Sequence, residues 1–157
     1  MKRFPHSVCL ALAVLTLPGI SRPVLAEERP FQLQKGGVFV RFDSYSGADV
    51  FAFGEITHLG KTYVSGRVGV NPTGPDTFDA FGSVVFIAAN GDRLYATVEG
   101  AGGISMFTGD VSSADFTLTF VGGTGRFADA SGSADLIFLY DPLSGAYFRS
   151  IEGTIDY

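Results

Sequence analysis

Apolar and polar residues alternate along most of the chain beyond residue 27. The alternation is clearest at residues 114–121, where Phe or Leu stands on either side of each threonine, and at residues 134–140. A period of two indicates β-strands that bury one face. The same pattern predicts eight strands, at residues 38–42, 49–57, 62–70, 82–89, 93–99, 114–121, 134–140 and 147–155.

Turn residues separate these segments. Asn-Gly-Asp at residues 90–92 is the strongest hairpin signal, and no stretch of ten or more residues has helical periodicity with a cap at each end. Residues 27–35 are mostly polar, and we expect them to form a loose arm with an early strand contact. Residues 71–75 and 100–113 predict longer connections, with a short extra strand at 104–107.

Short antiparallel strands joined by hairpins predict an all-β fold, either a closed eight-stranded up-and-down barrel or a sandwich. Closure removes exposed sheet edges, which benefits a chain rich in Val, Phe and Ile.

The sequence FVGGTGRFADASG, at residues 120–132, joins two of the predicted strands. Glycine permits a positive φ and a close approach of backbone segments. We therefore expect a structural corner, with Arg126 at its rim and Phe127 turned back over the core. The glycines assigned to this corner are Gly122, Gly123 and Gly125.

Residues 123–128 also match the dinucleotide-binding pattern G-x-G-x-x-A. That motif needs a following helix whose N-terminus holds a pyrophosphate. Gly132 comes too early for such a helix, and the strand pattern resumes directly after it. We therefore prefer the structural corner.

This corner, combined with E-G-T-I-D-Y at residues 152–157, resembles the allene oxide cyclase and dirigent barrels, and the small secreted bacterial members most of all. N-G-D-R-L-Y at residues 90–95 is similar to their hairpin as well. The resemblance implies a calycin-like, eight-stranded antiparallel closed barrel, often trimeric in the plant relatives. It covers the second half of the mature chain well and the first half only by strand spacing.

The resemblance carries no activity across. The plant cyclases line a cavity with a glutamate, asparagines and a tyrosine, and these cannot be matched here in any register. Tyr95 and Glu99 are the two candidate ligand-binding residues, and ordinary hairpin surface is the alternative for both. We assign no catalytic residue.

The first 26 residues have the pattern of a secretory signal. Lys2 and Arg3 precede an apolar run at residues 8–17, and cleavage is expected near Ala26. The run is too short to span a bilayer, and Pro18 interrupts it, so we expect no membrane anchor. The mature chain, residues 27–157, is expected to be one secreted or periplasmic domain.

The mature chain holds 8 basic and 16 acidic residues, which gives a net charge of −8. This acidity argues against nucleic acid and anionic membrane as partners. The single cysteine leaves with the signal, and His58 is the only histidine that remains. We expect His58 to be a solvated loop residue, and we expect no metal and no cofactor.

Three predicted strands are apolar on both faces, at residues 50–53, 84–87 and 136–139. A barrel of this size has one interior, so the second apolar face needs a partner. We therefore expect a homo-oligomer.

Three functions stay open. The preferred hypothesis is a non-enzymatic secreted barrel that binds a small apolar ligand or serves as an envelope component. The alternatives are an allene oxide cyclase-like isomerase or cyclase acting on a lipid-derived substrate in the lumen, and a dirigent-like protein that steers radical coupling. Fold alone does not choose among them.

Overall fold

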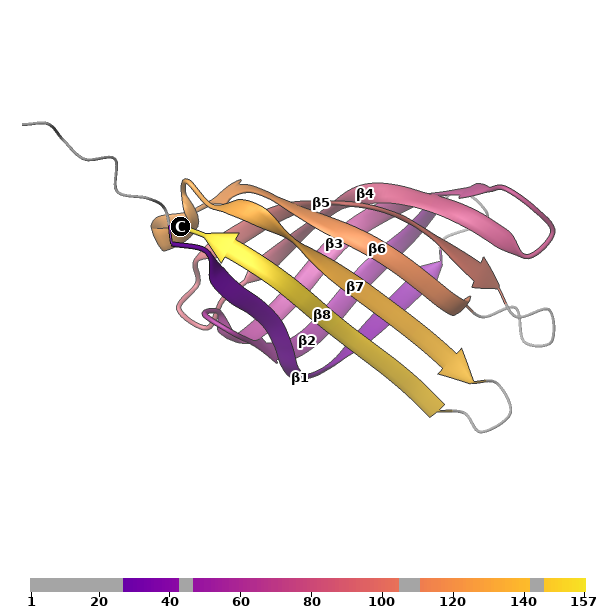
Figure 1. Cartoon of the computed structure of the whole chain (residues 1–157), viewed down its shortest axis with the longest axis horizontal. Coiled ribbons are helices and arrows are strands. Elements are labelled where there is room, and N and C mark those ends of the chain that lie inside the picture. The colour runs from indigo at the N-terminus through magenta and orange to yellow at the C-terminus, as the bar shows by residue number, and fades with distance from the viewer. Residues whose placement is uncertain (1–26, 43–46, 105–110, 142–145) are drawn as a thin grey trace, which may run out of the picture.

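The computed structural model describes residues 27–42, 47–104, 111–141 and 146–157. Within these ranges the chain forms one closed antiparallel barrel in which every strand pairs with its neighbours in sequence and β1 pairs with β8 (Figure 1). The strands are β1 (Arg29–Phe42), β2 (Gly47–Ile56), β3 (Gly60–Pro72), β4 (Thr77–Ile87), β5 (Arg93–Ile104), β6 (Val111–Gly123), β7 (Ser131–Asp141) and β8 (Ala146–Asp156). The all-β, eight-stranded closed barrel expected from the sequence is confirmed.

Most strands are a few residues longer than predicted, and the largest differences lie at three places. β1 begins at Arg29, so the predicted loose arm is a strand whose first residues pair with β8. β4 begins at Thr77, and β5 runs to Ile104. The exposed Phe81 weakens the alternation at the start of β4, and the glycines at 100, 102 and 103 weaken it at the end of β5, which explains why the pattern missed these extensions. Most of the extra strand predicted at 104–107 lies outside the described residues.

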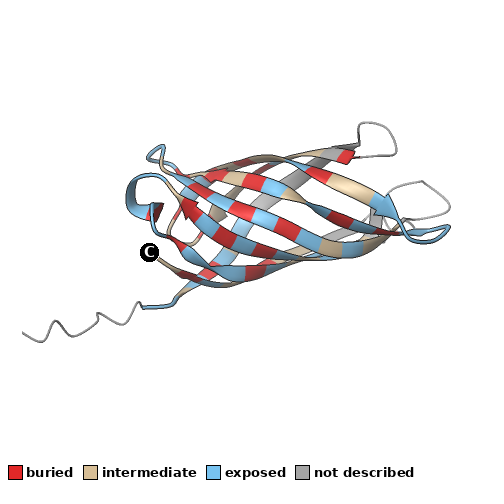
Figure 2. Ribbon diagram, turned by 90° about the horizontal axis from the view of Figure 1, so that it is seen from above, coloured by how far each residue is buried: buried red, intermediate tan, exposed pale blue. Residues whose placement is uncertain are grey.

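Alternation along the strands separates an inner from an outer face, which Figure 2 shows as buried and exposed positions that alternate along the ribbons. Three phenylalanines fill the interior near one end. The ring centroids of Phe31 and Phe120 are 4.7 Å apart, those of Phe31 and Phe86 are 5.8 Å apart, and all three rings are buried. This aromatic cluster packs the barrel solidly at that level.

The glycine-rich corner closes the same end. A single 3-10 turn, η2 (Gly125–Phe127), follows β6, and β7 begins at Ser131, so no α-helix follows the dinucleotide-like pattern. The Phe127 side chain is 0% exposed and its ring lies 4.9 Å from that of Tyr157. Arg126 is exposed beside the buried Phe127 in the turn that joins β6 to β7.

Three glycines of this corner have surroundings or backbone angles that disfavour a larger residue. Gly122 and Gly125 have φ values of 101° and 59°, a region that side chains with a Cβ rarely adopt. Gly123 instead lies so close to the backbone of Arg93 that a Cβ would collide with its carbonyl oxygen. Thr124 fastens the corner, since its N–H donates to the Arg93 carbonyl and its hydroxyl accepts from the Arg93 N–H.

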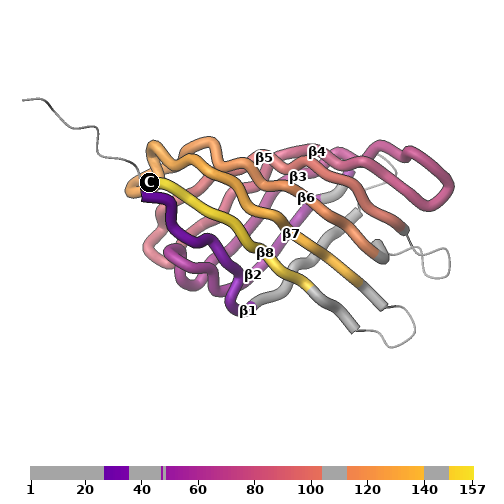
Figure 3. Tube along the Cα trace, viewed as in Figure 1, coloured from indigo at the N-terminus to yellow at the C-terminus, as the bar shows by residue number. Residues whose placement is uncertain are grey.

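The seam between β1 and β8 is much shorter than the other strand pairings. Among the described residues it holds four register pairs, from Arg29–Ile155 to Gln32–Glu152, whereas the other seven interfaces hold nine to eleven. A register shift between Leu33 and Lys35 bends β1 toward β2. Figure 3 shows the start of β1 beside the end of β8, next to the sealed end.

Candidate functional site

The half of the barrel away from η2, here called the distal half, has an inner wall that solvent reaches. By strand alternation its residues point inward, as their neighbours in the same phase do, yet several of them are only half-buried. The half-buried inward residues are Val50, Val70, Phe116, Leu136, Phe138 and Arg149.

Residues from opposite sides of the barrel form this wall. Val50, Val70 and Phe116 pack against a small buried cluster of Val68, Phe78 and Ala80. Leu136 and Phe116 are direct register partners on β7 and β6, and both also contact the main core. The wall is therefore apolar on several strands and ends at the Phe31–Phe86–Phe120 cluster.

Among the side chains of this wall that the structure describes, one is charged. Arg149 is in the same phase of β8 as Ile151 and Ile155, both of which are buried, and it stands opposite Phe138 on β7. The rest of the distal inner wall that the structure describes is free of carboxylates and of histidine, so no acid–base pair is assembled there. Sequence reasoning missed Arg149, and the signal that could have found it is its spacing of two residues from Ile151 on the same strand.

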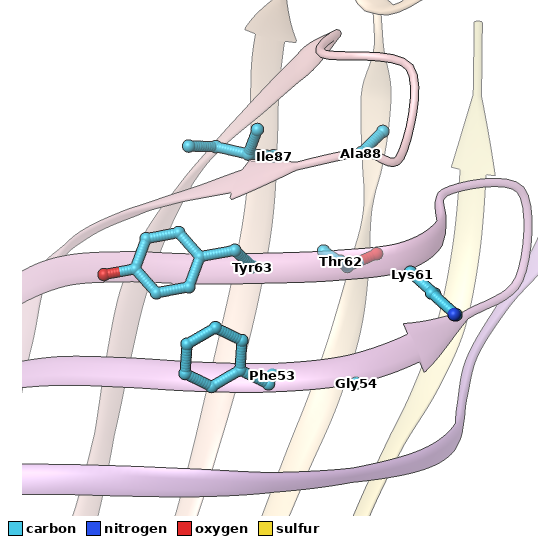
Figure 4. A pocket seen from close by; sticks show the side chains of 7 residues that line it. All are labelled: Phe53, Gly54, Lys61, Thr62, Tyr63, Ile87 and Ala88. Atoms are coloured by element: carbon cyan, nitrogen blue, oxygen red, sulfur yellow. The ribbon is translucent and has the colours of Figure 1, made fainter.

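A second candidate surface lies on the outside of the barrel. Phe53 on β2, Tyr63 on β3 and Ile87 on β4 are register neighbours, and the rings of Phe53 and Tyr63 lie 4.9 Å apart. They line a shallow, open hollow of about 410 Å³ (Figure 4). The hollow is lined by Phe53, Gly54, Lys61, Thr62, Tyr63, Ile87 and Ala88.

The hollow belongs to a larger apolar surface that we call the outer apolar face. The next register row carries Phe51, Val85 and Tyr95, of which Phe51 and Tyr95 are exposed. The outer apolar face thus consists of Phe51, Phe53, Tyr63, Val85, Ile87 and Tyr95. Segments predicted to be apolar on both faces do expose their second face, as Ile137 and Leu139 also do on β7.

The two candidate ligand-binding residues from the sequence point away from the lumen. Tyr95 and Glu99 lie on the outer face of β5, while Leu94, Ala96 and Val98 between and beside them are buried. Neither therefore lines the inner wall. Tyr95 instead joins the outer apolar face, and Glu99 stands opposite Phe81 on β4.

His58 occupies the sealed end and differs from the solvated loop residue that we expected. Its residue has a φ of 66°, its ring lies 5.9 Å from that of Tyr157, and its backbone carbonyl accepts a hydrogen bond from Arg126. Its Nε2 atom is buried without a hydrogen-bond partner among the described residues. The guanidinium of Arg29 lies over the same Tyr157 ring, 4.6 Å from its centroid. The expectation of a solvated side chain is therefore wrong, because the C-terminal tyrosine covers it.

The chain matches no protein family model, no curated protein and no solved structure. Within the described ranges, no three metal-ligating side chains gather in one place. The same part of the chain forms no helix that is long and apolar enough to cross a membrane. The predicted signal segment and its cleavage point at Ala26 lie outside the described residues.

Proposed function

We propose that the mature chain is an exported, non-enzymatic binding protein that holds a small apolar ligand in the distal half of its lumen. The observation that carries this proposal is the set of inward-facing apolar side chains that remain half-exposed there. Membership of the allene oxide cyclase and dirigent barrel superfamily is part of the same proposal, and the eight-stranded barrel supports it.

Apolar burial supplies the affinity in this proposal. Each Å² of apolar surface removed from water contributes about 25 cal/mol, so a ligand that buries 200 Å² of it gains about 5 kcal/mol before the costs of association.

A bulky residue on the distal wall is expected to abolish binding. N-phenyl-1-naphthylamine is a neutral apolar dye whose fluorescence rises when it leaves water, and we expect it to bind the wild-type chain. Val70→Trp places a large ring among Val50, Phe116 and Phe78 and should remove at least nine-tenths of the fluorescence gain.

Val121→Trp is the matched control for this experiment. Val121 is 58% exposed on the outside of β6, so the same substitution there should leave dye binding unchanged. A wild-type chain that fails to bind the dye, or a Val70→Trp chain that binds it fully, contradicts the proposed function.

We further propose that the outer apolar face joins copies of the chain into a homo-oligomer. Phe53, which is 59% exposed, belongs to this face and packs beside Tyr63, and monomers rarely leave such an apolar patch in water. A charge at this position would have to be desolvated in the interface at a cost of several kcal/mol.

Phe53→Asp is therefore expected to convert the oligomer into a monomer at micromolar concentration. Sedimentation velocity on the purified mature chain measures this directly. Val121→Asp, which changes an equally exposed apolar residue outside this face, should leave the oligomer intact. A monomeric wild-type chain would contradict the interface proposal.

A further inference from the structure

Charged residues border the outer apolar face at both ends, and their signs differ between its first two strands. Glu55 on β2 and Lys61 on β3 are register partners in the next outward row after Phe53. At the other end, Asp49 on β2 and Arg67 on β3 are register partners as well, and they form an ion pair of 2.9 Å. Along these borders β2 therefore carries the carboxylates and β3 carries the cations.

The row of Glu55 and Lys61 holds charges that a partner can use. Within the described residues neither side chain forms an ion pair, although the two residues stand opposite each other. Lys61 is exposed and also lines the hollow that contains the Phe53 and Tyr63 rings (Figure 4). A surface that covers this hollow therefore meets the ammonium group, and a carboxylate beside an apolar group complements it best.

The described outside of β6–β8 is a poor partner for the outer apolar face. Its central register rows carry hydroxyl and carboxylate side chains, so an apolar face laid on them would take the carboxylates from water without replacing their hydration. A ring of copies needs two different faces that meet, whereas a dimer uses one face twice. The rows contain Thr119, Ser133 and Thr154, and next to them Thr117, Asp135 and Glu152.

The outer apolar face complements a second copy of itself. In an isologous contact the same surface of both copies meets across a two-fold axis. An axis that runs along the strands between β2 and β3 lays each β2 on the other copy's β3, so that Glu55 faces Lys61. The same axis sets Phe53, the most exposed residue of the face, against the Tyr63 ring. An axis across the strands instead lays β2 on β2 and sets Glu55 against Asp49, which repel each other.

We propose that the outer apolar face pairs with itself, and that Glu55 of each copy faces Lys61 of the other in a two-fold dimer. This inference rests on the homo-oligomer proposed above, because it names the partner surface and the orientation of that contact. Apolar burial supplies most of the affinity, and the two charge pairs select this orientation over others. The chain is then a dimer, unlike the trimers common among the plant barrels that its sequence resembles.

Charge reversal tests this orientation. Lys61→Glu places a carboxylate opposite Glu55 of the other copy twice in each dimer, and Glu55→Lys does the same with ammonium groups. We expect each variant alone to dimerise about tenfold more weakly than the wild type, because like charges then face each other in the contact. Sedimentation velocity over a concentration series of the mature chain measures the dissociation constant, at low salt where such charges are least screened.

Mixing the two variants gives the decisive result. The Lys61→Glu chain carries carboxylates at both positions, and the Glu55→Lys chain carries ammonium groups at both. In an equimolar mixture opposite charges face each other again, so we expect heterodimers with an affinity close to that of the wild type. An effect of either substitution within its own chain cannot be reversed by mixing.

Lys35→Glu is the matched control. Lys35 is the register partner of Glu55 on the side away from Lys61, and it is exposed on β1. Because β1 lies outside a contact centred between β2 and β3, this charge reversal changes the surroundings of the same carboxylate without facing the second copy. The variant should dimerise as the wild type does.

The outcomes separate this inference from the interface proposal beneath it. If the wild-type chain is monomeric, both are overturned. If Phe53→Asp dissociates the wild-type oligomer but that oligomer is a trimer, or the mixture of charge variants does not recover, the two-fold inference is overturned and the interface proposal stands. If either charge variant fails to fold, the chain with both substitutions decides, since it should dimerise as the wild type does, and a weakened dimer overturns the inference.

Discussion

Phe127→Ala is expected to lower the free energy of unfolding by about 3–5 kcal/mol, the usual cost of removing a fully buried phenylalanine ring. The side chain is 0% exposed, closes one end of the barrel, and contacts the Tyr157 ring at 4.9 Å. Its loss leaves a cavity that η2 cannot collapse to fill, because Gly123 and Thr124 fix the corner against Arg93. Urea unfolding followed by tyrosine fluorescence measures the change, since the chain has no tryptophan.

Phe81→Ala is the matched control for the loss of a ring. Phe81 is 60% exposed on the outer face of β4, so the same truncation should cost less than about 1 kcal/mol. Equal effects of the two substitutions would show that Phe127 does not seal the core.

Gly123→Ala is expected to cost about 3 kcal/mol through overpacking. The added methyl group would collide with the carbonyl oxygen of Arg93 and come within 2.9 Å of the Phe127 Cβ. The Arg93 carbonyl also accepts the Thr124 N–H at 2.8 Å, so the corner cannot move aside without breaking a hydrogen bond.

Gly91→Ala separates this collision from backbone strain. Gly91 has a φ of 89° and nothing within 4 Å of an added Cβ, so only the left-handed backbone penalty of about 1–2 kcal/mol applies. The same urea titration measures both variants. A Gly123→Ala chain as stable as the wild type would contradict the close approach at the corner.

The sequence predicts most of this fold because a strand that buries one face alternates apolar and polar residues with a period of two. Residues 114–121 and 134–140 show that period, and β6 and β7 include them. The pattern fails where the inward position is a glycine, as at Gly100 and Gly102 near the end of β5, because glycine is neither clearly apolar nor polar. It also fails at β1, where the register shift after Leu33 exchanges the two phases.

The candidate site is harder to predict from the sequence than the fold. Alternation places Arg149 on the inner wall, but only coordinates show that this wall is half-exposed at Phe116 and Leu136 while Leu118 and Phe120 beside them are buried. Tyr95 and Glu99 were chosen by residue type, and their phase on β5 turns both outward. Residue chemistry therefore identifies candidates, and strand phase decides which side of the barrel they occupy.

The short β1–β8 seam determines how the cylinder is completed as the chain folds. Seven of the eight strand pairings in the barrel join strands that are adjacent in sequence. Such hairpins form early, because a short loop already holds the two strands close together. The eighth joins Gln32 to Glu152, which are 120 residues apart, and only four register pairs offset the entropy of closing so long a loop. We therefore expect the ring to close last during folding, and we expect these four pairs to separate first when thermal motion opens it again.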